Sequence, residues 1–581
     1  MKKKLSRNII IKYFVPPISL ALLLISAYAI KIFVFKPKTT KKTSATNKNS
    51  KILNIDFLKQ KLIEAKKFRK SGARNQEIEI YKNLLGYQSY FACVHLNLGK
   101  ALYLDKKYKS AEKYFRKAVE LKPNYSSGHV FLGKMLQLQN KYEESKKYLE
   151  TACKISPKYF DANLHLSKAY YQLNQFDKAL HYAHIALKLK PKNIYAQLNL
   201  AYTYNKGGEL NKAIRIYKKI LGKNTNLANA HYNLGYTYKI QGRLDKAIES
   251  LDRAIEIRPD YLEAHIARAQ AKIASERILD GWDEYEWRWG LFGIKPMQYK
   301  RLMWNGSYIK DKTILLRTEQ GLGDTMQFIR YAKIIKDMGA TVICKVQKPL
   351  VKLLSSCPYI DEVFCEIDNS IKYDTHAQIM SLPRILNTTN NTIPNEMNYL
   401  YANPKLEEEW KEKLSQDKNF KVGLCWHVDP IHEKDKSPWS IRSITLKQFK
   451  PFAKLNGVSF YSLQKFKDYK PLMNLPKGLL LKTFGEDFDE KNGAFMDSAA
   501  IIKNLDLVIT VDTCIAHLAG ALNKPVWMFL PYSPDCRWYL KRTDTPWYPT
   551  MKLYRQSKPN DWKNAIKKVA SDLSKEIKRA T

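Results

Sequence analysis

Acidic residues are scarce in this chain of 581 residues, with 55 Asp and Glu against 99 Lys and Arg and a net charge of +44. Such a charge favours contact with membrane lipid, nucleic acid or phosphorylated ligands. The lysines are spread over the whole sequence, however, so a general bias of the composition towards lysine explains the charge equally well. The sequence contains no zinc-finger spacing and no RNA-binding signature, so we expect no nucleic-acid partner.

Cysteine pairs are also missing, because none of the eight cysteines stands in a CxxC spacing. This pattern argues against a zinc site and against a disulfide scaffold. Most of these cysteines lie in apolar runs, where a thiol acts as a small hydrophobic group. We therefore expect a reducing compartment and no metal.

The first 50 residues contain 11 Lys or Arg and neither Asp nor Glu. The uncharged stretch Tyr13–Ile30 predicts a membrane anchor over residues 1–35, although its 18 residues are near the lower limit for a spanning helix. A cleaved signal peptide ending near Ala27-Tyr28-Ala29 is the alternative. Residues 36–50 have the composition of a flexible basic linker. The positive-inside rule barely discriminates between the two orientations.

A period of 34 residues runs through the first half of the chain. Proline recurs at four of five equivalent positions, Thr225 takes the fifth, and a leucine stands 25 residues before each. The prolines are Pro123, Pro157, Pro191 and Pro259, and the leucines are Leu98, Leu132, Leu166, Leu200 and Leu234. A small residue follows each leucine, so two helices can approach closely and the proline can end the second. The pattern resembles the tetratricopeptide repeat.

This resemblance implies an all-α solenoid over residues 90–292, preceded by a degenerate helical repeat at 51–89. Repeats of this kind bind a protein or peptide on a concave face and do not catalyse. A rigid spacer between the membrane and the last domain is the alternative role.

From Lys312 onward, short apolar runs alternate with helical stretches, which predicts parallel sheets covered by helices. A charged stretch at Pro404–Asn419 divides this region. We therefore expect two Rossmann-like domains, at 300–415 and 416–560, and a basic helix at 561–581. Buried strands are predicted at Thr313–Arg317, Thr341–Val346, Glu362–Ile367, Val422–Trp426, Val458–Leu463, Leu505–Val511 and Val526–Leu530.

Two strand–turn–helix segments have the residues of ligand sites. In the first, Gln320, Gly321 and Gly323 form a tight turn that sets Asp324 beyond the end of a strand. In the second, Asp512 and Thr513 precede a helix starting at Cys514, and the amide groups of that helix could hold a diphosphate. His517 follows on the same helix and is equally well explained as a hydrogen-bonded packing residue. The first turn lacks the third glycine of GxGxxG, which disfavours a dinucleotide-dependent oxidoreductase.

Six segments together resemble the bacterial tetratricopeptide-repeat proteins with a heptosyltransferase-like glycosyltransferase domain. They are GLGDTMQFIRY (321–331), HEKDKSPWSIRSI (432–444), SLQK (462–465), VDTCIAHLAGALNKPVW (511–527), LPYSPDCRWYL (530–540) and PWYP (546–549). The resemblance implies a GT-B fold. It also implies that Asp324 is the general base on the acceptor side, with Gln320, Gly321 and Gly323 in the acceptor-side loop.

The same resemblance implies a donor side that neutralises the leaving diphosphate. Arg442 is the best match for its basic residue and Lys436 the second. The other donor-side residues are Gln464, Asp512, Thr513, Cys514, His517 and His427. Two of them depart from the pattern, because Cys514 stands where glycine is usual and His427 where a small residue is usual.

The function that we expect from these features is inverting, metal-independent sugar transfer from a nucleotide sugar to an unknown acceptor. No cofactor is required, and Asp487-Phe488-Asp489 is a DxD only in form. Nucleotide sugars are cytosolic, so a single-pass membrane protein with its carboxyl-terminal part in the cytoplasm is expected. The alternative is a scaffold whose repeats bind partners and whose GT-B domain is inactive or senses a nucleotide.

Overall fold

The computed structural model describes most of the chain from residue 55 onward. The described residues are 55–87, 91–290, 302–367, 370–396, 398–429, 433, 436–465 and 475–580. They form two compact units, divided between Asn199 and Leu200.

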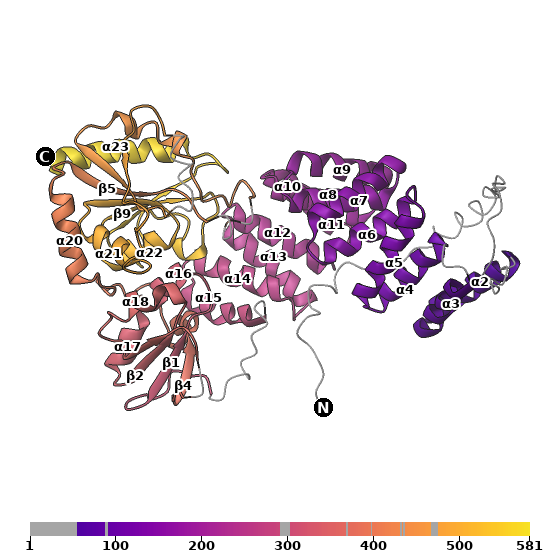
Figure 1. Cartoon of the computed structure of the whole chain (residues 1–581), viewed down its shortest axis with the longest axis horizontal. Helices are drawn as coiled ribbons and strands as arrows, with labels where there is room; N and C mark the ends of the chain where they lie inside the picture. The colour runs from indigo at the N-terminus through magenta and orange to yellow at the C-terminus, as the bar shows by residue number, and fades with distance from the viewer. Residues whose placement is uncertain are drawn as a thin grey trace, which may run out of the picture. The chain divides into compact units, whose positions relative to one another are not determined.

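The first unit consists of helices that pack as consecutive pairs (Figure 1). The helices are α2 (Ile55–Ser71), α3 (Arg74–Tyr87), α4 (Ala92–Leu104), α5 (Tyr108–Leu121), α6 (Ser126–Leu138), α7 (Tyr142–Ile155), α8 (Phe160–Gln172) and α9 (Phe176–Leu189). The next helix, α10 (Ile194–Lys206), spans the division between the units. Each of α5, α7 and α9 ends two residues before a proline of the 34-residue period, as the sequence predicts.

Small residues allow the helices of a pair to come together. A Cβ atom on Gly99 would lie 2.6 Å from the ring of Phe115, and one on Gly133 would lie 2.6 Å from Cγ of Leu149. The Ser145 hydroxyl also donates a hydrogen bond to the carbonyl oxygen of Gly133 (2.9 Å). The small positions of the period are therefore contact points between the two helices of a repeat.

The second unit continues the helix pairs with five further α-helices and one 3-10 helix. They are α11 (Leu210–Leu221), α12 (Ala228–Ile240), α13 (Leu244–Ile257), α14 (Leu262–Ala274), α15 (Ile278–Tyr285) and η2 (Glu286–Gly290). After them the chain changes to alternating strands and helices.

A four-stranded parallel sheet comes first, with the order β3-β2-β1-β4. Its strands are β1 (Thr313–Arg317), β2 (Thr341–Lys345), β3 (Glu362–Phe364) and β4 (Thr375–Gln378). The helices that follow these strands are α16 (Leu322–Phe328), α17 (Tyr331–Asp337), α18 (Val351–Leu354) and α19 (Leu382–Ile385).

A six-stranded parallel sheet follows, with the order β10-β9-β8-β5-β6-β7. Its strands are β5 (Phe420–Cys425), β6 (Val458–Ser462), β7 (Leu481–Lys482), β8 (Leu507–Val511), β9 (Val526–Leu530) and β10 (Met551–Arg555). The helices of this part are α20 (Pro404–Ser415), α21 (Met496–Lys503), α22 (Cys514–Ala521) and α23 (Lys563–Ala580).

Alternation along β9 shows how the six-stranded sheet is buried. Val526, Met528 and Leu530 pack in the core that contains residues of α21 and α22. Trp527 and Phe529 pack in the core that contains the apolar face of α23. Figure 1 shows α23 on one side of this sheet and α21 and α22 on the other. The strands are apolar on both faces because helices cover both.

The strand orders determine where a ligand is expected. In each parallel sheet the chain adds strands first on one side of the first strand and then on the other side. The first strand is β1 in the smaller sheet and β5 in the larger. In such doubly wound sheets, ligands bind outside the carboxyl ends of the strands at the point where the order reverses. In the larger sheet this point lies between β5 and β8, and the residues after these strands begin with Trp426 and Asp512.

Buried contacts join the last helix pairs to the sheets within the second unit. Arg288 of η2 is 1 % exposed, and its guanidinium pairs with Glu319 beyond the end of β1 (2.8 Å) and donates to Ser381 Oγ (2.8 Å). Trp439 lies in a loop after β5, is 5 % exposed, and donates from Nε1 to the carbonyl oxygen of Asn205 in α10 (3.1 Å). These helices therefore contact the segments that follow β1 in the smaller sheet and β5 in the larger sheet.

The expected all-α repeats and the α/β region with parallel sheets are confirmed. The predicted single-pass membrane localisation is contradicted, because no helix in the described part of the chain is long and apolar enough to cross a bilayer. The longest described helix, α23, has 18 residues but alternates charged and apolar groups. Residues 1–35 and the linker at 36–50 lie outside the described residues.

Candidate functional site

The first β–α turn places Asp324 in the opening turn of α16. Gly321 is the N-cap of this helix, and its N–H donates to Oδ2 of Asp324 (2.9 Å). The Thr325 hydroxyl contacts the Gly321 carbonyl oxygen (3.4 Å) and donates to Gln347 (2.9 Å). Gln320 donates from its side chain to the Tyr285 hydroxyl (3.4 Å). One oxygen of Asp324 therefore caps its own helix.

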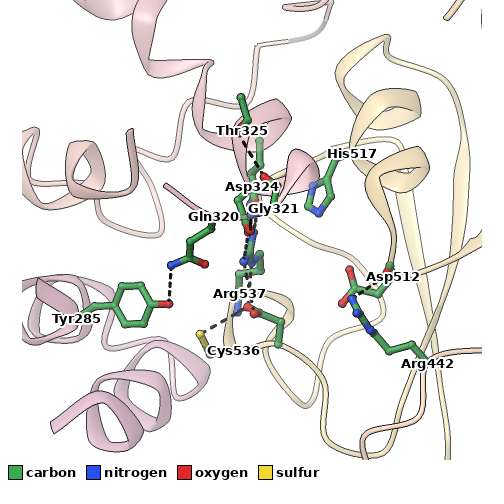
Figure 2. Close-up of polar contacts among 12 residues, drawn as sticks. Tyr285, Gln320, Gly321, Asp324, Thr325, Arg442, Asp512, His517, Cys536 and Arg537 are labelled. Carbon is green, nitrogen blue, oxygen red and sulfur yellow. Dashed lines mark hydrogen bonds and ion pairs between the residues drawn. The ribbon is translucent and has the colours of Figure 1, made fainter. Parts of the chain in front are cut away.

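The other oxygen of Asp324 accepts a hydrogen bond from an arginine in the segment between β9 and β10 of the larger sheet. Arg537 Nη2 donates to Asp324 Oδ1 (2.6 Å), and Arg537 Nη1 donates to the side chain of Gln327 (2.6 Å). Figure 2 shows the guanidinium lying between Asp324 and the loop of Cys536. The side chains are 9 % exposed for Arg537 and 18 % for Asp324. This ion pair joins residues 213 positions apart in the sequence.

Arg537 also binds Asp535, with Nε donating to Oδ1 (2.9 Å). Burial raises the pKa of Asp535, but the charge and hydrogen bonds of Arg537 outweigh this effect and lower the pKa to about 2. Both carboxylates around Arg537 are therefore held in a compact charged cluster, with Arg537 at its centre.

The two turns of the site lie against each other at Gly323. A Cβ atom on Gly323 would be 2.7 Å from Cδ2 of His517 and 3.5 Å from the Cα of Cys514. A side chain at position 323 would therefore collide with α22, which gives this glycine a packing role.

His517 is a buried packing residue, 5 % exposed, with Nδ1 2.9 Å from the hydroxyl of Tyr548. Burial lowers its pKa well below the usual value, and the charges of Arg537 and Arg330 add to this effect. The imidazole is therefore neutral at physiological pH and adds no positive charge for a phosphate.

Asp512 and Arg442 meet at the carboxyl end of β8. Arg442 Nη1 donates to the main-chain oxygen of Asp512 (3.0 Å), and the two side chains lie side by side in Figure 2. Burial raises the pKa of the Asp512 carboxyl, and the charge of Arg442 opposes this shift only in part. Arg442 is half-buried, and Arg442 and Asp512 both border a pocket that is described below.

Thr513 is the N-cap of α22, but within the described residues its side chain makes no capping hydrogen bond. Its hydroxyl instead lies 3.3 Å from the hydroxyl of Thr510 and 3.8 Å from the sulfur of Cys425. Burial raises the pKa of the neighbouring Cys514 thiol to about 12, so this thiol stays protonated. Thr513 therefore stands at the start of the helix, as the sequence predicts, but its side chain does not cap the helix.

The remaining predicted residues lie in the loops after β5 and β6. Gln464 accepts a hydrogen bond at Oε1 from the main-chain N–H of His427 (3.0 Å), and so fixes the loop after β5. Lys436 is exposed, three residues before the buried Trp439. The structure thus brings Arg442 and Asp512 together, while Gln464 and His427 meet in a neighbouring contact.

A pocket of about 270 Å³ lies between repeat helices and the carboxyl ends of the strands of the larger sheet. Arg442, Asp512 and Cys536 border it from the α/β region, and Tyr236, Lys239 and Gln270 border it from α12 and α14. Its position matches the reversal point of the strand order. Its volume is close to the lower end of the range for small-molecule sites.

The DxD segment is buried only in part, because Phe488 and Asp489 lie in the interior whereas Asp487 is exposed. Asp489 is 6 % exposed and accepts hydrogen bonds from the main-chain N–H of Ser498 (3.0 Å) and from its hydroxyl (2.5 Å). No group of three or more potential metal ligands occurs among the residues that the structure describes. These contacts give Asp489 a structural role.

Arg537 and Lys239 were not among the predicted site residues. Arg537 stands in the apolar and aromatic segment Cys536–Leu540, and a buried arginine requires a carboxylate partner. That requirement could have drawn attention to it. Lys239 is one of many lysines in the repeats, and no local signal distinguishes it.

Family models for the tetratricopeptide repeat match residues 92–125, 136–183, 164–228 and 228–261. The chain therefore carries tetratricopeptide repeats, followed by an α/β region with parallel sheets.

One curated relative is protein FlbA of Caulobacter vibrioides, which is 25 % identical over 338 residues. The match covers 54 % of this chain and 55 % of FlbA, so the chain spans about half the length of that relative.

Solved structures similar to the repeats include YrrB, described as a TPR protein with an unusual peptide-binding site. It is 24 % identical, with 32 % of this chain and 95 % of YrrB covered and a TM-score of 0.28. A tetratricopeptide repeat protein from Parabacteroides merdae is 14 % identical, with 42 % of this chain and 93 % of that chain covered and a TM-score of 0.36.

Proposed function

We propose that this chain is a protein-interaction protein whose repeats bind a protein or peptide partner and whose α/β region binds a phosphorylated ligand of the nucleoside diphosphate class. In this proposal the ligand is sensed and not turned over. The family-model matches support the first part, because tetratricopeptide repeats are binding modules.

The hydrogen bonds of Asp324 support the proposal that the ligand is not turned over. A general base needs a carboxylate oxygen within reach of the proton that it abstracts. Oδ1 of Asp324 accepts from Arg537 and Oδ2 accepts from Gly321, so both oxygens are engaged in holding the fold. Release of either oxygen would break a partly buried ion pair or a helix cap.

Ligand binding is supported by the pocket at the reversal point of the larger sheet. Arg442 borders this pocket and offers a guanidinium, which matches the geometry of phosphate oxygens. The parallel strands bring the ends of β5 and β8 together at the position where nucleotides bind in doubly wound sheets.

Thermal unfolding in the presence of ADP, CDP, GDP and UDP tests this function. A ligand present at 100 times its Kd stabilises the folded chain by roughly 2.7 kcal/mol. We expect one or more of these diphosphates to raise the unfolding temperature, and we expect Arg442→Gln to remove the effect. An unchanged unfolding temperature with every nucleotide contradicts the proposed binding.

Sugar transfer by a GT-B domain is a second candidate, and one observation favours it. The turns before α16 and α22 face each other at Gly323 and Cys514, as a transferase with acceptor and donor sides requires. This candidate also needs Asp324 to leave Arg537. It predicts that the protein releases a diphosphate from a nucleotide sugar, and that Asp324→Asn abolishes the release without reducing stability.

A further inference from the structure

The pocket at the end of the larger sheet has one wall made by repeat helices. Lys239 and Tyr236 come from α12, and Gln270 comes from α14. The opposite wall carries Arg442 and Asp512. A ligand that fills this pocket therefore touches the repeats as well as the α/β region.

Trp439 fixes this wall in place. Its indole donates to the carbonyl oxygen of Asn205, and its ring meets that of Tyr236 edge-on at 6.1 Å between centroids. Its own carbonyl oxygen accepts from the N–H of Ser533, which also borders the pocket. The loop that carries Arg442 is thus docked between α10, α12 and the strand ends, which fixes the position of both walls.

Lys239 has an environment that suits an anion. Lys239 is half-buried as a residue, and its ammonium group donates to Oε1 of Gln270 (2.5 Å) and lies 4.9 Å from the centre of the Tyr236 ring. In the described part of the chain, no carboxylate forms an ion pair with Lys239. Burial lowers the pKa of Lys239, and the neighbouring Cys536 and Asp535 oppose this shift only in part. Asp535 is itself bound to Arg537. A partly buried ammonium with only a neutral partner is costly, and a bound anion would remove that cost.

We propose that Lys239 is a ligand-binding residue supplied by the repeats, and that it contacts the phosphate groups of the same ligand that Arg442 binds. Two cations from opposite walls suit a diphosphate better than a single carboxylate, because a diphosphate has charged oxygens at both of its phosphorus atoms. Gln270 holds the ammonium in position. This inference rests on the proposed ligand-binding function.

Isothermal titration of the full-length chain with inorganic pyrophosphate and with ADP, CDP, GDP and UDP tests the inference. Lys239→Gln and Lys239→Met remove the charge, and Lys246→Gln removes an exposed charge on α13 as the matched control. Loss of one charged hydrogen bond predicts about tenfold to a hundredfold weaker binding for the two Lys239 variants. The Lys246 variant should bind like the wild type.

A purely structural role for Lys239 gives a different result. In that case Lys239→Met lowers the unfolding temperature without ligand, whereas a lysine kept for binding leaves it equal or higher. Equal affinity of the wild type and both Lys239 variants overturns the inference while the proposed function stands. Failure of the wild type to bind any of the probes contradicts the proposed function itself, and the inference fails with it.

Discussion

Replacement of Asp324 by asparagine distinguishes a structural carboxylate from one kept for chemistry. Asparagine preserves the shape and still offers an oxygen to the N–H of Gly321, so the helix cap survives. The charged hydrogen bond from Arg537 is lost. At 18 % and 9 % exposure of the two side chains, solvent screens this pair only weakly. We therefore expect a loss of about 1.5–3 kcal/mol in the free energy of unfolding of the α/β region.

Asp324→Ala removes the cap as well and should cost a further 0.5–2 kcal/mol or so. Asp337→Asn is the matched control, because Asp337 is 65 % exposed and 3.5 Å from Lys333. Its effect should remain within about 0.5 kcal/mol. A double-mutant cycle of Asp324→Asn with Arg537→Gln should give a coupling energy of about 0.5–3 kcal/mol.

Hydrogen exchange of the amides in α16 and α22 is the assay of choice. The repeats and the α/β region need not unfold in one step, so a single unfolding midpoint would mix their contributions. We expect faster exchange in both helices of the Asp324→Asn variant. If exchange is unchanged or slower, Asp324 does not stabilise the fold, and the argument against its role as a base is refuted.

Three further predictions concern other parts of the chain. Trp439→Ala should cost about 3–5 kcal/mol and expose the loop 436–443 and α12 to faster hydrogen exchange; unaltered exchange would show that the loop is not docked. Gly133→Ala should destabilise the first unit by about 1–3 kcal/mol in urea unfolding, because its Cβ would meet Leu149, whereas Gly86→Ala, with nothing within 4 Å, should be neutral or stabilising. Burial lowers the pKa of Lys100 to about 7 from 10.5, and Arg69 and Lys134 add to the shift. Above pH 7 the folded state loses this proton before the unfolded state does, so stability should rise between pH 7 and 9, and Lys100→Met should flatten that rise; an equal slope in both proteins would contradict the prediction.

Much of the fold could be predicted because its signals are local. Periodic proline and glycine positions indicate the repeats, and continuous apolar runs indicate the inner strands. Strand β4 was missed because its sequence, Thr375–Gln378, is polar although its last three residues are buried. Pairing with β1 buries it, and a single sequence does not show that partner.

The site was predicted less completely, because its contacts join distant segments. The sequence places Asp324 and Asp512 at strand ends, but it does not indicate that Arg537 reaches across 213 residues to Asp324. It also does not show that a repeat helix brings Lys239 to the pocket. The close approach of α22 to Gly323 likewise depends on how the two sheets meet.

The most direct test of the central claim is equilibrium dialysis of radiolabelled nucleotide sugars against the full-length protein, with chromatography of the bound and unbound label. The proposed function predicts that any nucleotide sugar that binds is recovered intact and that Arg442→Gln abolishes its retention. Recovery of a nucleoside diphosphate and sugar, in amounts that exceed the protein and that depend on Asp324, would contradict it and establish catalysis.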